Sequence, residues 1–288
     1  MEIILDQVTA ERLKGDREKF KLLSELQSIY RGSLARQRRL VADRLVEILA
    51  SHARPKDFNS WQRLVDFQYA GHPLSAHGSV TSESGGRFNV GDVDQFNLRP
   101  FPALYLGSSR KVAFFEKYGV QENGTQGRLA AHEAALADYG SIACVRVKGH
   151  LESWVDVEDR KCLKKLTAVF RTFTIPKEAH ALARKLGIVK PLTVICTPEQ
   201  LLKTLREENW RQWTMHFDLL SNSQHLGQIA WNAGIEALEY TSTKAAGRCL
   251  AIYPENFKDS LAFVEIEDAS PPSLRHKRLD GNSWKEFL

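Results

Sequence analysis

Apolar residues recur at helical intervals along the N-terminal part of the chain. From about residue 8 to residue 51, leucine, isoleucine and valine return every three or four positions, and lysine and arginine fill the positions between them. This spacing places the apolar side chains on one face of a helix. The pattern stops at Arg54-Pro55, because proline disfavours helical backbone at the residue before it. We therefore predict a helical N-terminal extension over residues 1–58.

A loop-like stretch follows this extension. A short helix is predicted at residues 61–69, and residues 71–91 are then rich in glycine and serine. Loops of this length are uncommon in a globular domain unless they bind something. We therefore expect a binding loop here, and it contains Arg87.

The next segment predicts a strand followed by a helix. Residues 103–106 are short, apolar and aromatic and follow two prolines, which is typical of the start of a strand. A helix over residues 110–118 would be capped by Ser108 or Ser109 and ended by Gly119. Within it Glu116 follows apolar residues by three and four positions, so its carboxylate is expected to be partly desolvated, and either paired or functional.

The remainder of the chain mixes both kinds of element, which favours an α+β fold. Helices are predicted at residues 128–137, 161–170, 178–186, 199–209 and 226–233. Strands are predicted at residues 142–147, 155–157, 192–196, 235–240, 249–253 and 261–266. Residues 271–288 are mostly polar, and we predict a polar C-terminal tail there.

Composition adds only broad limits. The 288 residues are 43% hydrophobic and 26% charged, as in an ordinary globular protein, and the net charge is +5. This charge suits a phosphate-bearing ligand, but it equally suits solubility or attraction to nucleic acid. The four cysteines are widely spread, which favours free thiols over disulfides or a metal site. No basic start or membrane-length apolar run is present, so a cytoplasmic location is predicted.

Several familiar catalytic motifs are missing from the sequence. There is no Walker A loop, no Gly-x-Gly-x-x-Gly and no Gly-x-Ser-x-Gly. His132-Glu133 begins like a zinc-binding helix, but Leu136 stands where the second histidine would be needed. We therefore expect no metal.

Four short blocks remain, and together they resemble a known family. They are Gly85-Gly86-Arg87-Phe88-Asn89, Ala103-Leu104-Tyr105-Leu106, Ala113-Phe114-Phe115-Glu116 and Glu239-Tyr240-Thr241-Ser242. Over residues 60–265 these look like the signature blocks of the RES domain, which is named for Arg, Glu and Ser. The resemblance implies an NAD-consuming toxin of the RES–Xre toxin–antitoxin type, with an ADP-ribosyltransferase-like split β-core flanked by helices.

The same resemblance organises the chain into parts. It implies a RES-like NAD-binding catalytic domain over residues 59–270, with a helical insertion at about 155–215. A protein antitoxin or immunity partner is expected and homo-oligomers are possible, whereas membrane or nucleic-acid partners are not expected.

The resemblance also implies roles for individual residues, with NAD as the substrate. Arg87, Glu116 and Ser242 are the expected catalytic residues, and Arg87, Asn89, Tyr105 and Ser242 are expected to bind NAD. Cleavage of the nicotinamide–ribose bond passes through an oxocarbenium-like state, which a carboxylate such as Glu116 stabilises. Arg87 can pair with a phosphate, Tyr105 can stack on a ring, and Ser242 can hydrogen-bond the amide or ribose.

Other interpretations remain open at this point. Each of these side chains also has an ordinary structural reading, as a surface ion pair, a core ring or a turn cap. The enzyme could use phosphate, water or a macromolecule as acceptor, the last being an ADP-ribosyltransferase. In a different class, the basic N-terminal helix could belong to an inactive nucleic-acid- or partner-binding protein. Glu236 and Glu239 are expected to be surface residues.

Overall fold

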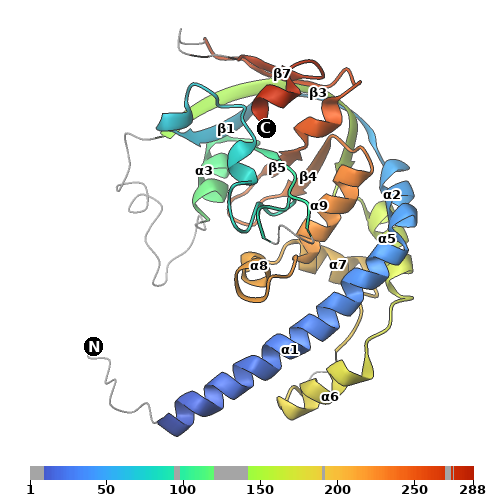
Figure 1. Ribbon diagram of the computed structural model, residues 1–288. Coiled ribbons are helices and arrows are strands. Elements are labelled where there is room, and N and C mark those ends of the chain that lie inside the picture. Colours follow the sequence, from blue (N-terminus) through green and yellow to red (C-terminus); the bar gives the residue numbers. More distant parts are fainter. Residues whose placement is uncertain (1–9, 94–97, 120–141, 190–191, 270–273, 275) are drawn as a thin grey trace.

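The protein has a mixed α+β fold in a computed structural model that describes residues 10–93, 98–119, 142–189, 192–269, 274 and 276–288 (Figure 1). The helices of the described residues are α1 (Ala10–Leu40), α2 (Ala42–Ala50), α3 (Arg110–Tyr118), α5 (Arg160–Phe170), α6 (Lys177–Lys185), α7 (Pro198–Leu205), α8 (Arg211–Phe217) and α9 (Asn222–Asn232). The strands are β1 (Arg54–Asp66), β2 (Leu104–Gly107), β3 (Ile142–Asp156), β4 (Ala237–Thr241), β5 (Arg248–Ile252), β6 (Phe263–Ile266) and β7 (Arg278–Asp280).

The described strands form one sheet in the order β1-β2-β5-β4-β3-β6-β7. The long strands β1 and β3 also pair with each other, from Arg54 opposite Trp154 to Asp66 opposite Ile142. This extra pairing joins β1, β2, β5, β4 and β3 into a closed circuit, and β3 and β4 run parallel within it. The described strands hydrogen-bond into this one curved sheet, and the split β-core implied by the family resemblance stays a prediction.

Alternate residues of the central strands pack on opposite faces of the sheet, as the period of a β-strand requires. Cys249 and Ala251 of β5 face a core shared with helices α2, α5, α7 and α9. Leu250 and Ile252 face a second core, which includes β6, β7 and Phe287. The sheet is therefore buried on both faces.

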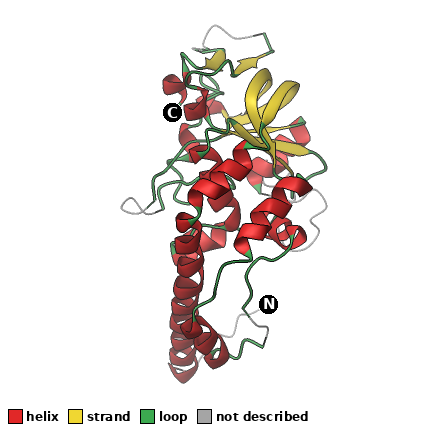
Figure 2. Ribbon diagram, turned by 90° about the vertical axis from the view of Figure 1, so that its right-hand side faces the viewer, coloured by secondary structure: helices red, strands yellow, loops and turns green. Residues whose placement is uncertain are grey.

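Helix α1 extends well beyond this body of the protein (Figure 2). It is 31 residues long and packs against α6, with Leu26 completely buried among Ala179, Leu182 and Ala183. We call α1, α6 and the residues packed between them the helical arm. The helical extension predicted from the sequence is confirmed over α1 and α2, and the domain boundaries at residues 58 and 270 stay predictions.

Three local predictions are wrong. The helix predicted at 61–69 is largely replaced by strand β1, which is held by its pairing with β3. The predicted end of the helical pattern at Arg54-Pro55 is confirmed, since α2 ends at Ala50 and β1 begins at Arg54. Residues 192–196 form no strand, since Val194 and Ile195 pack against the helical core.

The polar tail is the third. Residues 276–288 include strand β7 and the short turn of helix Trp284–Phe287, with Leu279 and Phe287 buried. A few apolar side chains in a polar segment are enough to fix it to the second core.

The helix predicted at 128–137 lies outside the described residues. Among those described, no helix is long and apolar enough to cross a membrane.

Candidate functional site

The glycine-rich loop before β2 holds Arg87 at the edge of a cavity. Gly85 has a positive φ of 66°, a conformation that glycine adopts without strain. A side chain on Gly86 would collide with the hydroxyl of Tyr105 and with Oδ1 of Asn89. The two glycines therefore serve a sharp turn and a close approach to Tyr105.

The buried side chain of Asn89 holds this loop in place through hydrogen bonds. Its side chain is 0% exposed, and Nδ2 donates to the carbonyls of Ser79 at 2.9 Å and Phe101 at 3.0 Å. Oδ1 accepts from the amide of Gly86 at 2.8 Å and the hydroxyl of Tyr105 at 2.9 Å. With its amide fully used, Asn89 has the geometry of a positioning residue instead of the direct NAD contact expected from the sequence.

Tyr105, on strand β2, is tied to the same loop through its hydroxyl. That hydroxyl donates to Asn89 and accepts from the backbone amide of Phe88 at 2.9 Å. Burial raises the pKa of Tyr105 well above its usual value. The phenol is therefore neutral, and its ring lines the cavity.

Glu116 projects from helix α3, which forms as the sequence predicts. Ser109 caps the helix by accepting from the amide of Val112, and Gly119 ends it in the left-handed conformation. Oε1 of Glu116 accepts from the hydroxyl of Ser242 at 2.6 Å and from the amide of Thr243 at 3.3 Å.

Ser242 lies in the turn that follows β4. Its buried hydroxyl accepts from the amides of Lys244 at 3.0 Å and Ala245 at 3.1 Å while it donates to Glu116. The hydroxyl therefore both closes the turn and fixes the carboxylate.

The guanidinium of Arg87 is clamped by backbone. Arg87 is 5% exposed, and Nη1 donates to the carbonyls of Leu205 at 3.2 Å and Glu207 at 2.9 Å. Nη2 donates to Oγ1 of Thr243 at 3.0 Å. Thr243 thus links the two charges of the site, because its hydroxyl accepts from Arg87 and its amide donates to Glu116.

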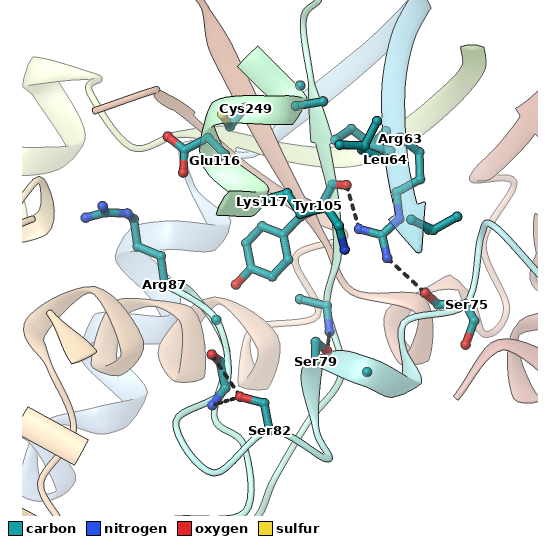
Figure 3. Close-up of a pocket in the computed structure, with 18 of the residues that line it drawn as sticks. Arg63, Leu64, Ser75, Ser79, Ser82, Arg87, Tyr105, Glu116, Lys117 and Cys249 are labelled. Atoms are coloured by element: carbon teal, nitrogen blue, oxygen red, sulfur yellow. Dashed lines mark hydrogen bonds between the residues drawn. The ribbon is translucent and has the colours of Figure 1, made fainter. Parts of the chain in front are cut away.

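Arg87, Tyr105 and Glu116 line one cavity of about 700 Å³. Figure 3 shows Glu116 above Arg87, with Tyr105 beside them and Arg63 on the far side of Tyr105. The volume lies within the range of roughly 300–1,000 Å³ that is typical of small-molecule sites. Ser242 and Asn89 do not line this cavity themselves. Ser242 hydrogen-bonds Glu116 and Asn89 hydrogen-bonds Tyr105, so each orients a residue that does.

The cavity is basic. Among the described residues its lining contains five basic side chains and two acidic side chains, namely Arg63, Arg87, Lys117, Arg211 and Lys244 against Asp66 and Glu116. Excess positive charge around a concave site attracts anions. The basic side chains therefore suit an anionic ligand, and the carboxylate of Glu116 can stabilise a positive charge that forms on that ligand during a reaction.

Sequence reasoning missed two of these arginines. Arg63 lies on β1 and donates to the carbonyls of Pro73, Tyr105 and Ser75 at 3.0–3.2 Å, so it holds the loop that forms one wall of the cavity. Burial lowers its pKa to about 10, so it stays charged at neutral pH. Arg211 lies at the start of α8, and partial burial lowers its pKa as well. No alternation of apolar and polar residues runs through residues 54–66, where Phe58, Trp61 and Leu64 recur at every third position, so the sequence offers no signal that places Arg63 on a strand.

The expectation that Glu236 and Glu239 are surface residues is wrong. Both are buried, at 2% and 6% exposure. Glu239 pairs with Lys56 at 2.5 Å and with Arg248 at 2.9 Å, and Glu236 accepts from the backbone amides of Glu152 and Ser153. Buried carboxylates need such partners, and neither of the two lines the cavity formed by the described residues. The residues that the structure describes also contain no cluster of His, Cys, Asp or Glu able to bind a metal ion.

Comparisons with known proteins identify a family. The comparison with curated proteins found no match. Among solved structures, the chain is similar to one described as the crystal structure of the M. tuberculosis MbcT–MbcA toxin–antitoxin complex, at 14% identity and a TM-score of 0.36 over 84% of this chain and 96% of that chain. The sequence profile of the RES domain matches residues 60–274, which is more than half of the chain and includes Arg87, Tyr105, Glu116 and Ser242. The chain therefore belongs to the RES domain family.

Proposed function

We propose that the protein cleaves the nicotinamide–ribose bond of NAD and transfers the ADP-ribose to phosphate or water. The observation that carries this proposal is the connection through Thr243, which holds the cation of Arg87 and the carboxylate of Glu116 at one wall of a basic cavity. The activity implied by the RES family agrees with that arrangement. An ADP-ribosyltransferase-like fold is part of the same proposal.

Glu116 would act on the reacting ribose. Bond cleavage leaves positive charge on the ring oxygen and the adjacent carbon, and a fixed carboxylate stabilises that charge. Oε1 is held by Ser242 and Thr243, and among the described residues Oε2 has no recorded hydrogen bond. Oε2 is thus available to hold a ribose hydroxyl or to face the developing cation.

Arg87 would anchor the pyrophosphate of NAD. Two of its nitrogens are fixed by Leu205, Glu207 and Thr243, so its orientation is set before a ligand arrives. A preorganised guanidinium binds phosphate oxygens without first losing conformational freedom. The other basic side chains of the cavity add to the attraction, and the ring of Tyr105 offers a stacking surface.

Toxicity and an antitoxin or immunity partner follow from the same proposal. Consumption of NAD would harm the cell that makes the protein. A protein partner that covers the cavity, or that inhibits the protein by binding elsewhere on it, would therefore be required for viability.

The test is to incubate the purified protein with NAD, with and without phosphate, and to follow nicotinamide release. We expect release by the wild type, its loss in Glu116→Gln, and unchanged release in Glu47→Gln, which removes an exposed carboxylate on α2. Absence of nicotinamide release under both conditions would refute the enzyme proposal.

The same assay identifies the acceptor. Release that depends on phosphate indicates phosphorolysis, and release without phosphate indicates hydrolysis. Transfer of labelled ADP-ribose to a protein would instead indicate an ADP-ribosyltransferase.

A further inference from the structure

The segment that clamps Arg87 is itself held from the other side. Residues 205–211 join α7 to α8, and their carbonyls at Leu205 and Glu207 accept from Arg87. The same segment ends in Trp210 and Arg211, which line the cavity. Any shift of this segment therefore moves both the clamp on Arg87 and part of the cavity wall.

Helix α1 contacts this segment through Trp213 of α8. The guanidinium carbon of Arg31 lies 3.1 Å from the centre of the Trp213 ring, and Nε1 of Trp213 donates to the carboxylate of Glu207 at 3.1 Å. Glu207 therefore receives the indole on its side chain and Arg87 on its backbone carbonyl. The path from α1 to the cavity is one stacked pair and two hydrogen bonds long.

A second contact fixes the direction of α1 against α8. Phe20 stacks on Phe217, with ring centres 6.4 Å apart. Phe20 and Arg31 are eleven positions apart, which is close to three helical turns and places both on the same face of α1. Two contacts on one face hold α8 along its length.

The electrostatics support a fixed arginine. Burial lowers the pKa of Arg31 to about 10, and the nearby carboxylate of Glu207 opposes that effect. A desolvated guanidinium over a tryptophan face is a stronger contact than an exposed one. Arg31 also donates from Nε to Gln27 at 3.3 Å, so its orientation is set within α1.

We infer that α1, which lies outside the residues matched by the RES profile, positions Arg87 through the chain Arg31–Trp213–Glu207. The inference rests on the proposed function in one respect, since it takes Arg87 as the anchor of NAD. Arg31 and Trp213 are positioning residues, and neither acts on the reacting bond.

The first test needs no ligand. Hydrogen–deuterium exchange is measured over residues 205–213 in the wild type, Arg31→Ala and Arg36→Ala. Arg36 is exposed on the same helix, so its variant removes the same charge without touching Trp213. We expect faster exchange in Arg31→Ala only. Unchanged exchange over residues 205–213 in a folded Arg31→Ala protein would overturn the inference.

The second test measures steady-state nicotinamide release from NAD. Because the inference concerns the anchor and leaves Glu116 in place, Arg31→Ala is expected to raise KM by roughly threefold to tenfold with little change in kcat. Arg31→Lys keeps the charge but loses the planar stack, and is expected to lie between the wild type and Arg31→Ala. This variant also replaces Arg31→Ala in both tests if the alanine variant does not fold.

The outcomes separate the two proposals. If the wild type releases no nicotinamide, the proposed function fails, and the exchange measurement still decides whether α1 holds residues 205–213. If Arg31→Ala loosens that segment but keeps the wild-type KM, the segment does not position Arg87 for NAD and the inference fails.

Discussion

One carboxylate oxygen, Oε1 of Glu116, receives hydrogen bonds from two consecutive residues. Ser242 contributes its hydroxyl and Thr243 its backbone amide, while the Thr243 hydroxyl serves Arg87. The sequence points to Ser242 through the family motif, but it offers no signal for the backbone amide, since every residue except proline has one. The role of Thr243 is therefore visible only once the turn that follows β4 is placed against α3.

Ser242→Ala tests how far this support matters to activity. The hydrogen bond to Glu116 is 2.6 Å long and involves a carboxylate, so it is of the strong, charge-assisted kind. Losing it is expected to cost about 1.5–3 kcal/mol, which is roughly a tenfold to hundredfold loss in kcat for nicotinamide release if the bond acts in the transition state.

Thr243→Val is the matched control, because it keeps the amide donor to Glu116 and removes only the acceptor for Arg87. It is expected to raise KM for NAD and to leave kcat nearly unchanged. Equal effects of both variants on kcat would contradict the separate roles assigned to the two residues.

At the scale of elements, local signals identified α3 and β2 and missed β1. The capping serine, the apolar spacing and the terminal glycine that define α3 are all contained in the helix and its ends. Strand β1 contains Pro55 and several polar residues and is held by its register with β3, which is distant in the sequence. Tertiary pairing of this kind overrides local propensity, so Arg63 could not be placed.

Phe287 shows the same effect at the other end of the chain. It is 1% exposed in the second core, and its carbonyl accepts from the amide of Ala76 at 2.8 Å. Phe287→Ala is expected to lower the free energy of unfolding by about 3–5 kcal/mol, as measured by urea denaturation. Lys285→Ala, at an exposed position of the same turn, should change it by less than about 0.5 kcal/mol. If Phe287→Ala left the free energy of unfolding unchanged, the C-terminal segment would contribute nothing to the second core, as expected of the polar tail predicted from the sequence.

Charges join the ends of three strands around Arg248 on β5. Its guanidinium pairs with Asp156 at 2.7 Å, with Glu239 at 2.9 Å and with Glu158 at 3.5 Å. Burial raises the pKa of Glu158, but hydrogen bonds from Arg206 and Thr241 outweigh it, so the pKa is lowered overall. A carboxyl group with a lowered folded-state pKa stabilises the fold above its unfolded pKa and loses that contribution as the pH falls through the folded value.

Arg248→Ala is expected to destabilise the protein at neutral pH. It removes a cationic partner shared by three partly buried carboxylates, of which Glu239 keeps Lys56 and Glu158 keeps Arg206, and we expect a loss of about 2–4 kcal/mol. Arg278→Ala removes more exposed ion pairs and should cost about 1 kcal/mol or less.

Arg206→Ala tests the pH dependence, because Arg206 lowers the pKa of Glu158. Its cost relative to the wild type should shrink as the pH falls through the lowered pKa of Glu158 and the carboxylate becomes protonated. Urea denaturation at neutral and acidic pH measures both variants, and an Arg206→Ala deficit that is constant with pH would contradict the argument.

At the scale of the whole molecule, the buried apolar residues fall into separate clusters. Two of them lie on the faces of the sheet, and the third lies in the helical arm between α1 and α6. Apolar periodicity predicted both helices of this arm, within residues 8–51 and at residues 178–186, but no pattern within a single element indicated that α6 would be the partner of α1. Because the arm cluster includes no sheet residue, its stability should be partly independent of the sheet.

Leu26→Ala tests that independence. Leu26 is 0% exposed within the arm, and removing its side chain is expected to cost about 2–5 kcal/mol there. Amide exchange should accelerate in α6 and in the part of α1 that packs on it, while β3, β4 and β5 keep wild-type protection. Leu49→Ala is the matched control, since Leu49 is equally buried but belongs to the core shared with the sheet, and its loss should lower protection throughout. If Leu26→Ala lowered protection in the sheet as much as in the arm, the two would unfold as one unit. The contacts Arg31–Trp213–Glu207 would then open only when the whole protein unfolds, because the arm would have no local unfolding equilibrium of its own.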